Sequence, residues 1–275
     1  MALPRASTVS VRAAFRAAAN AIAAVVFPAP CRICEAVLDT ASRTPVCAKC
    51  LASFATIQPP WCACCGRPIV SPVVADSLQI LCRLCRAETY GFDLARSFAT
   101  YNTPMVRAIM LLKHEAVAPM GVWFAGRLAE IVAREEQIAG VDLIVPVPLH
   151  PARLRERGYN QAELIAKPLA RKLHLPYKAY LLVRTKPRPD KLRLTRRERW
   201  LAVRGAYEAR VGARVDNLHV LLVDDVMATG ATLDACSRAL RKAGVARVTA
   251  VTVARSVPSW SLADGAPEQP GVPIF

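Results

Sequence analysis

The chain has 275 residues, of which 53% are hydrophobic and 21% charged. This composition excludes a disordered or fibrous protein and leaves room for about two domains of roughly 150 residues each. No run of about 18 apolar residues occurs, so we expect no transmembrane helix. Lys and Arg outnumber Asp and Glu by 37 to 21, a net charge of +16, which favours a polyanionic partner: nucleic acid, a phosphorylated small molecule or an acidic membrane surface.

The first 30 residues contain three arginines, no acid and an alanine-rich stretch. Two interpretations are open: a signal peptide, or an amphipathic helix over about residues 9–26 that stops at Pro28. We favour the helix, within an N-terminal region of residues 1–29. Closely paired cysteines follow, and these are metal ligands in a reducing compartment. The expected location is therefore cytoplasmic.

Nine of the ten cysteines lie before residue 86, and eight of these form four CxxC pairs. Zinc takes four thiolates in a tetrahedron, and a two-residue gap lets one tight turn supply two of them. We therefore predict two structural zinc sites in a double ribbon over residues 30–90. Consecutive pairs are favoured as partners, and a cross-braced arrangement of the first pair with the third stays open. Gly66 suits a turn with positive φ, and Cys64 is expected to be a free thiol. The eight predicted ligands are Cys31, Cys34, Cys47, Cys50, Cys62, Cys65, Cys82 and Cys85.

From about residue 90, strand and helix patterns alternate. Helices are expected to start at Thr103, to cover about 121–135, to follow Asn160 as N-cap, and to lie near 231–243. Buried strands are expected at 142–145, 220–223 and 246–253. This alternation predicts an α/β domain over residues 91–258, with a mostly parallel sheet, flanking helices and a tail of residues 259–275. Ligands of such sheets bind beyond the carboxyl ends of the strands.

The segment VLLVDDVMATGAT, residues 220–232, leads from a strand through a loop of small residues into a helix. Small residues let backbone N–H groups close around a phosphate, and the helix N-terminus adds partial positive charge. Asp224 and Asp225 suit vicinal ribose hydroxyls or a hydrated Mg²⁺. The alternative is a generic strand, loop and helix with chance acids. The combination of acids and loop favours a ribose 5-phosphate.

At every position this segment resembles the signature by which type I phosphoribosyltransferases bind phosphoribosyl pyrophosphate (PRPP). Nearly the whole chain resembles the ComF/GntX family of competence-related proteins, through the cysteine pairs, YNTPMVRAIMLLKHE (101–115), PVPLHPARLRERGYNQAELIA (146–166) and RRERWLAVRGAY (196–207). The resemblance implies a type I phosphoribosyltransferase fold and Mg²⁺ bound with PRPP. It assigns the ribose to Asp224 and Asp225, and the 5-phosphate to Ala228, Thr229, Gly230, Ala231 and Thr232.

The resemblance also places a pyrophosphate-binding loop after the first core strand. We assign that loop to Pro146, Val147, Pro148 and Leu149, with His150 beside it. Arg153, Arg155 and Arg157 follow, and either meet pyrophosphate or form a solvated basic face. Two departures affect the acceptor: Lys191 and Ala202 stand where the family usually carries Gln and Asn.

Residues 184–204 carry nine basic residues and two acids. This basic segment is open to three explanations: a loop that closes over an active site, a track for a nucleic-acid backbone, or an ordinary solvated face. Trp200 and Tyr207 are the aromatic residues nearby, so a stacking platform for single strands is not evident.

Three functions are consistent with these features. The favoured one is Mg²⁺-dependent transfer of a phosphoribosyl group from PRPP to an unknown nitrogen acceptor. The second is a non-catalytic protein that binds PRPP or a nucleotide and handles single-stranded DNA, or contacts a competence helicase, in DNA uptake. The third is a regulator that senses PRPP without catalysis.

Overall fold

The computed structural model describes residues 29–38, 43–69, 80–87, 90–187, 195–212 and 214–257. The chain divides into two compact units, residues 1–53 and 54–275. The helix expected over 9–26, the tail 259–275 and Lys191 lie outside the described residues. None of the described helices is both long enough and apolar enough to cross a membrane.

The first unit is built around two cysteine-bearing turns. In the first turn, the backbone N–H of Cys31 donates to the carbonyl of Ala36 at 2.7 Å. The second turn leads into helix α2 (Ala48–Ala52), where the Sγ atom of Cys47 accepts from the N–H of Cys50 at 3.4 Å. The described apolar side chains buried here besides cysteine are Ile33, Leu38 and Val46. So small a core is typical of a module that folds around metal.

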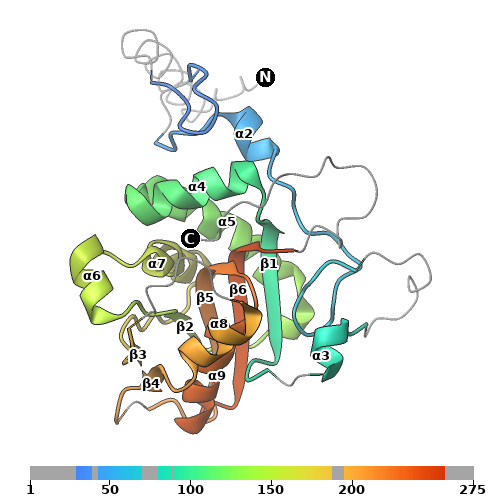
Figure 1. Ribbon diagram of the computed structural model, residues 1–275, viewed down its shortest axis with the longest axis vertical. Helices are drawn as coiled ribbons and strands as arrows, with labels where there is room; N and C mark the ends of the chain where they lie inside the picture. Colours follow the sequence, from blue (N-terminus) through green and yellow to red (C-terminus); the bar gives the residue numbers. More distant parts are fainter. Residues whose placement is uncertain are drawn as a thin grey trace, which may run out of the picture. The chain divides into compact units, whose positions relative to one another are not determined.

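The second unit is centred on a parallel sheet of four strands in the order β1–β6–β5–β2 (Figure 1). The two central strands pair along their whole length, from His219 with Arg247 to Met227 with Arg255. Both are buried almost throughout, as the continuous apolar sequence of a strand covered on two faces requires. The strand bounds are β1 Leu94–Thr100, β2 Leu143–Pro146, β5 His219–Met227 and β6 Arg247–Arg255.

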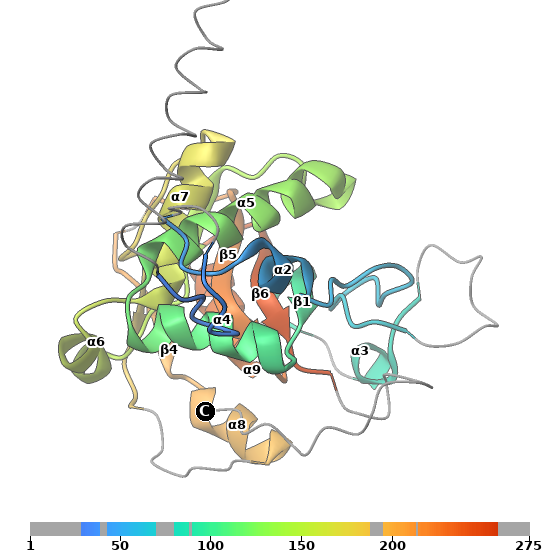
Figure 2. The same cartoon turned by 90° about the horizontal axis from the view of Figure 1, so that it is seen from above.

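Helices cover both faces of this sheet. α5 (Ala118–Arg134) and α7 (Gln161–Leu173) pack on each other over one face, and α9 (Ala231–Lys242) lies on the other (Figure 2). The close approach of α5 to α7 depends on Gly121, where a Cβ atom would lie 2.3 Å from the carbonyl oxygen of Leu164. The remaining elements are α3 (Arg83–Ala87), α4 (Thr103–His114), η2 (Glu136–Ile138), α6 (Pro151–Arg157), β3 (Leu182–Arg184), α8 (Arg196–Val203) and β4 (Tyr207–Ala209). β3 and β4 form a separate antiparallel pair.

The predicted α/β architecture is confirmed, and the differences from expectation are local. Asn160 caps α7 as predicted, its Oδ1 accepting from the N–H of Ala162 at 3.0 Å. The helix expected over 121–135 begins earlier, at Ala118. The strand expected over 220–223 continues to Met227, so the two acids lie inside β5 rather than after it, because β6 pairs with this whole stretch.

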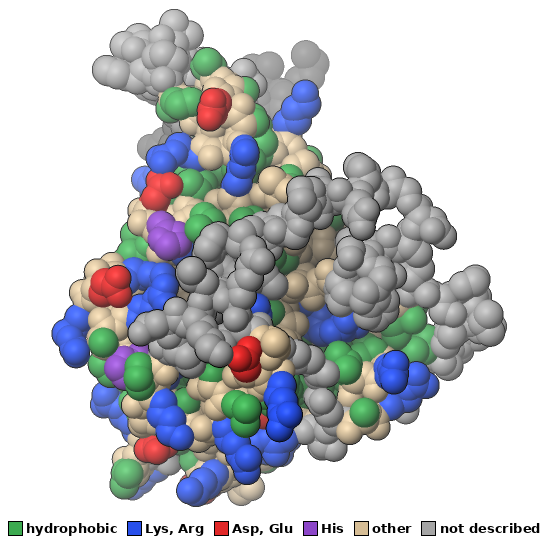
Figure 3. Space-filling view, in the orientation of Figure 1, with side chains coloured by type: hydrophobic (Ala, Val, Ile, Leu, Met, Phe, Trp, Pro, Cys, Tyr) green, Lys and Arg blue, Asp and Glu red, His purple; other side chains and the backbone are tan. Residues whose placement is uncertain are grey.

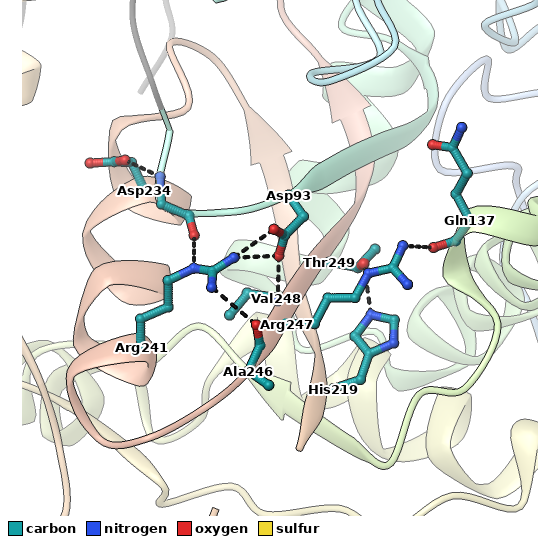
Figure 4. A network of polar contacts seen from close by, with 10 residues as sticks. Asp93, Gln137, His219, Asp234, Arg241, Ala246, Arg247, Val248 and Thr249 are labelled. Atoms are coloured by element: carbon teal, nitrogen blue, oxygen red, sulfur yellow. Dashed lines mark hydrogen bonds and ion pairs between the residues drawn. The ribbon is translucent and has the colours of Figure 1, made fainter. Parts of the chain in front are cut away.

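Helix α9 is fastened to the sheet by the segment that enters β1 (Figure 4). The Oδ1 of Asp234, in the first turn of α9, accepts from the N–H of Gly91 at 2.6 Å. In the last turn, Arg241 donates to the carbonyl of Gly91 at 2.8 Å and to the carboxylate of Asp93 at 2.6 Å. Asp93 in turn accepts from the N–H of Val248 in β6 at 2.8 Å. These contacts fix both ends of the helix that follows the phosphate loop.

Candidate functional site

The predicted phosphate loop connects the end of β5 to the start of α9. Gly230, the N-cap of α9, has φ of +85°, and a Cβ atom there would lie 3.0 Å from side-chain atoms of both Met227 and Tyr90. Only glycine accommodates this conformation and this contact without strain. Thr229 is held on both sides: its Oγ1 accepts from the N–H of Ala231 at 3.3 Å, and its carbonyl accepts from the Tyr90 hydroxyl at 3.4 Å. The loop therefore has a defined shape at a helix N-terminus, where an anion is stabilised.

A cavity of about 440 Å³ lies over this loop and brings most of the predicted site residues together. From the pyrophosphate loop and α6 it is lined by Val147, Pro148, Leu149, Arg153 and Arg157, whereas Pro146 and Arg155 are not among its lining residues. The shape of this loop is fixed from α7, because the Nδ2 of Asn160 donates to the carbonyl of Val147 at 3.0 Å. From β5, the phosphate loop and α9, the cavity is lined by Asp224, Asp225, Ala228, Thr229, Gly230, Ala231 and Thr232.

The walls of the cavity are cationic, and most of these cations were not predicted as site residues. Burial lowers the pKa of Arg157, and the neighbouring Arg153 lowers it further. Cations crowded in this way favour an anionic occupant. The Lys and Arg side chains on the lining are Lys113, Arg153, Arg157, Arg184 and Arg199, against the acids Glu156, Asp224 and Asp225. His114 also lines the cavity, and burial lowers its pKa. Lys and Arg are also the commonest charged side chains on the face in Figure 3, over α6 and toward the lower edge.

The two acids in β5 are buried, with exposures of 7% for Asp224 and 4% for Asp225, and they are held differently. The Oδ1 of Asp224 accepts from the backbone N–H of Asp225 at 2.9 Å. The Oδ2 of Asp225 lies 2.7 Å from the Nζ of Lys113, in the last turn of α4. Burial raises the pKa of Asp224 well above its usual value, and the Asp225 charge adds to this. At Asp225 burial acts in the same direction, but the Lys113 ammonium outweighs it and the pKa is lowered.

Sequence reasoning missed Lys113 because the contact spans more than 100 residues of the chain. Tyr207 was missed as a site residue, and Arg184 was predicted only as part of the basic segment 184–204 that could close over an active site. The Nη1 of Arg184 donates to the Tyr207 hydroxyl at 3.2 Å, between strands that pair antiparallel. A basic residue in the last turn of a helix, as in Lys113, fits the helix dipole and by itself gives no signal of a site.

The eight paired cysteines form two groups of four, one in each unit. Within each group the sulfur atoms all lie within 4.8 Å of one another, and the groups join consecutive pairs, which is the favoured arrangement and not the cross-braced one. The Sγ atoms of Cys31 and Cys50 are 3.8 Å apart, as are those of Cys65 and Cys82. A tetrahedron with Zn–S bonds of about 2.3 Å has edges of about 3.8 Å. All ten cysteines are free thiols, and the two groups fit two zinc ribbon sites.

Two family models match the chain in the same order as these features. A double zinc ribbon domain matches residues 22–87 and a phosphoribosyl transferase domain matches residues 160–265. Competence protein F of Haemophilus influenzae is 28% identical over 221 residues, 76% of this chain and 89% of that protein. Competence protein ComFC of Bacillus subtilis is 27% identical over 77% of this chain and 84% of its own length. DNA utilization protein YhgH of Salmonella typhimurium is 27% identical over 71% of this chain and 84% of its own length.

The chain belongs to the ComF family. In this ComF-family protein the turn at Cys31–Cys34 and the turn at Cys62–Cys65 share one geometry. Each has a residue of positive φ directly after its second cysteine, Glu35 (φ 65°) in the first ribbon and Gly66 (φ 65°) in the second. Glycine at the second turn has a further cause. A Cβ atom on Gly66 would lie 2.5 Å from the carbonyl oxygen of Ala95 in β1. The second ribbon thus packs its turn directly on the edge strand of the sheet.

Cys64, one of the two cysteines outside both groups, lies in that same turn. It is half-buried, and a hydrogen bond with Cys85 lowers its pKa. Its carbonyl accepts from the N–H of Ala95 at 2.7 Å, which adds to the contact of the second ribbon with β1. Ala202, one of the two positions where the resemblance predicts a departure from the family pattern, lies on the lining of the cavity.

Proposed function

We propose that this protein binds PRPP, or another phosphoribosyl ligand, in the cavity over the phosphate loop and transfers its phosphoribosyl group to a nitrogen acceptor. One observation carries the proposal: a buried acid pair and a phosphate loop at a helix N-terminus line the same cavity, together with lysine and arginine side chains. Acids suit ribose hydroxyls, and the cationic groups suit phosphates. Thiolate sites and a metabolite ligand both fit the cytoplasm.

Each part of the ligand has a complementary group in this arrangement. The 5-phosphate would bind the N–H groups and hydroxyls of residues 228–232, and the ribose hydroxyls would donate to Asp224 and Asp225. The pyrophosphate would lie along residues 147–149, toward Arg153 and Arg157. Magnesium carried by the pyrophosphate would neutralise its charge as it leaves.

The reaction exchanges one bond at C1 of the ribose. The lone pair of the acceptor nitrogen forms the new bond, the C1–O bond breaks, and its electrons leave with pyrophosphate while the nitrogen releases a proton to water. Positive charge develops on the ribose ring during this exchange, and the buried Asp225 carboxylate would stabilise that charge. The cationic wall would stabilise the departing pyrophosphate in the same way.

Titration calorimetry of the zinc-loaded protein with PRPP and Mg²⁺ tests the proposal. Saturable binding is expected for the wild type, and its loss for the Asp224→Asn/Asp225→Asn double variant. Release of pyrophosphate in the presence of purine and pyrimidine bases or simple amines tests transfer. Saturable binding without turnover would refute the transferase and favour a regulator that senses PRPP. Absence of PRPP binding would refute both functions.

A second function is favoured by the names of the relatives, which refer to competence and DNA utilization, together with the net charge of +16. In this version the protein is an accessory that handles single-stranded DNA or contacts a helicase in DNA uptake. Fluorescence anisotropy with a labelled oligothymidylate would then show affinity that falls steeply with salt. Neutralising Arg197 and Arg204 together should weaken it further. No binding at low salt would exclude direct DNA handling.

A further inference from the structure

Lys113 is placed to act on the acid pair from outside the elements that carry the signature. It belongs to the last turn of α4, its side chain is 15% exposed, and its Nζ lies 2.7 Å from the Oδ2 of Asp225. The helix is held in place by its buried face, which includes Met105, Ile109 and Leu112. Lys113 is also among the residues that line the cavity. A lysine buried to this degree needs a compensating charge.

The contacts of the two carboxylates leave little room for a metal ion. Asp225 gives one oxygen to the ammonium, and Asp224 gives one to a backbone N–H. An ammonium 2.7 Å from a carboxylate occupies the position that a cation ligated by that oxygen would take, and repels a second cation nearby. The acid pair therefore does not fit a directly coordinated Mg²⁺, which demands near-octahedral oxygen ligands at about 2.1 Å. The oxygens that remain are well suited to accept hydrogen bonds from ribose hydroxyls.

We propose that Lys113 is the resident counter-ion of the acid pair, a positioning residue that holds Asp225 as the ribose acceptor and excludes a protein-bound divalent cation. Divalent metal then enters the cavity only with a pyrophosphate-bearing ligand. The ribose part of the proposal rests on the proposed function. The exclusion of metal concerns the ligand-free protein and stands independently of it.

The test uses the zinc-loaded full chain and two probes, Mn²⁺ followed by water-proton relaxation and ribose 5-phosphate followed by calorimetry. Ligand-free wild type is expected to bind no Mn²⁺ at the acid pair. Lys113→Met should gain a Mn²⁺ site that disappears when Asp225→Asn is added. Ribose 5-phosphate should bind the wild type equally without added divalent metal and in Mg²⁺, and at least 10-fold more weakly in Lys113→Met. Lys172→Met, on the exposed side of α7, is the matched control and should behave as the wild type.

The outcomes separate this proposal from the proposed function. A Mn²⁺ site in the ligand-free wild type that Asp225→Asn abolishes would overturn the counter-ion role, whatever the protein does with PRPP. Absence of both ribose 5-phosphate and PRPP binding in the wild type would refute the proposed function and leave the Mn²⁺ result to decide on Lys113. If Lys113→Met fails to fold, the wild-type measurements still decide: Mg²⁺-dependent binding of ribose 5-phosphate refutes the proposal.

Discussion

The guanidinium group of Arg255 joins the second cysteine group to the centre of the sheet through Cys65. Its Nη1 donates to the carbonyl of Cys65 at 2.7 Å, and its Nη2 lies 3.4 Å from the Cys65 sulfur. The same Nη1 is 2.8 Å from the Sδ of Met227, at the end of β5. Arg255 is 1% exposed. Four thiolates around Zn²⁺ carry a net charge of about −2, so a buried cation at this position stabilises the loaded site.

Arg255→Met is therefore expected to weaken zinc binding at the second site by about 10- to 100-fold, the range for outer contacts of metal ligands. The first site should be unaffected. Competition with a chromogenic chelator measures both zinc ions as two release phases, of which only one should become faster. Arg171→Met, on the exposed side of α7, is the control. Equal weakening of both sites, or of neither, would contradict this role of Arg255.

Loss of the two zinc sites should have unequal effects on the sheet, because only the second lies in the same compact unit. Cys82→Ser is expected to lower the thermal midpoint of that unit by at least about 5 °C, since one kcal/mol moves a domain of this size by roughly 2–4 °C. Cys47→Ser should leave it unchanged. All four tryptophans lie after residue 53, so their fluorescence reports this unit. A similar shift in both variants would refute the asymmetry.

The acid pair predicts opposite effects of two substitutions that remove one charge each. Asp225→Asn leaves the buried Lys113 without its partner and should lower the free energy of unfolding by about 3–5 kcal/mol. Asp224→Asn removes a buried charge whose raised pKa opposes folding at neutral pH, and should raise the free energy of unfolding by on the order of 1 kcal/mol. Urea denaturation at pH 7 measures both.

The pH dependence of the Asp224→Asn effect provides the control. The raised pKa means that protonated Asp224 is favoured in the folded state, so the wild type loses stability as pH rises through that pKa. The gain from Asp224→Asn should therefore be small near pH 4 and larger at pH 7. A gain that is constant with pH would have another origin. Both variants are expected to lose binding of the ribose ligand. At Asp224 the two effects therefore have opposite signs: Asp224→Asn gains stability and loses ligand affinity.

The sequence predicted the parts of this protein whose chemistry is local, and failed where distant segments meet. The CxxC spacing and the segment at 220–232 each place several ligands or donors within one turn. The two cysteine groups and the strand–loop–helix could therefore be predicted from the sequence. Lys113 meets Asp225 only because α4 packs near the end of β5. Gly66 was predicted for its φ, but the second reason, its contact with Ala95, appears only in the folded chain. The strand end was misplaced because pairing with β6 extends β5 past the acids.

Two glycines of α5 offer a matched test of how the helices pack. A Cβ atom on Gly121 would lie 2.3 Å from the backbone oxygen of Leu164, whereas on Gly126 the nearest atom is the flexible end of Lys172 at 3.9 Å. Gly121→Ala should therefore push α5 from α7 and lower the free energy of unfolding by about 1–3 kcal/mol or more. Gly126→Ala should raise it by up to about 1 kcal/mol, because alanine is the better helix former.

Because Asn160, the N-cap of α7, holds the predicted pyrophosphate loop through the carbonyl of Val147, the displacement in Gly121→Ala should reach the site. We expect weaker binding of PRPP in Gly121→Ala and unchanged binding in Gly126→Ala, measured by calorimetry below the unfolding transition. If Gly121→Ala loses stability and keeps its affinity for PRPP, then the loop is held independently of the α5–α7 contact, and Asn160 is a capping residue alone.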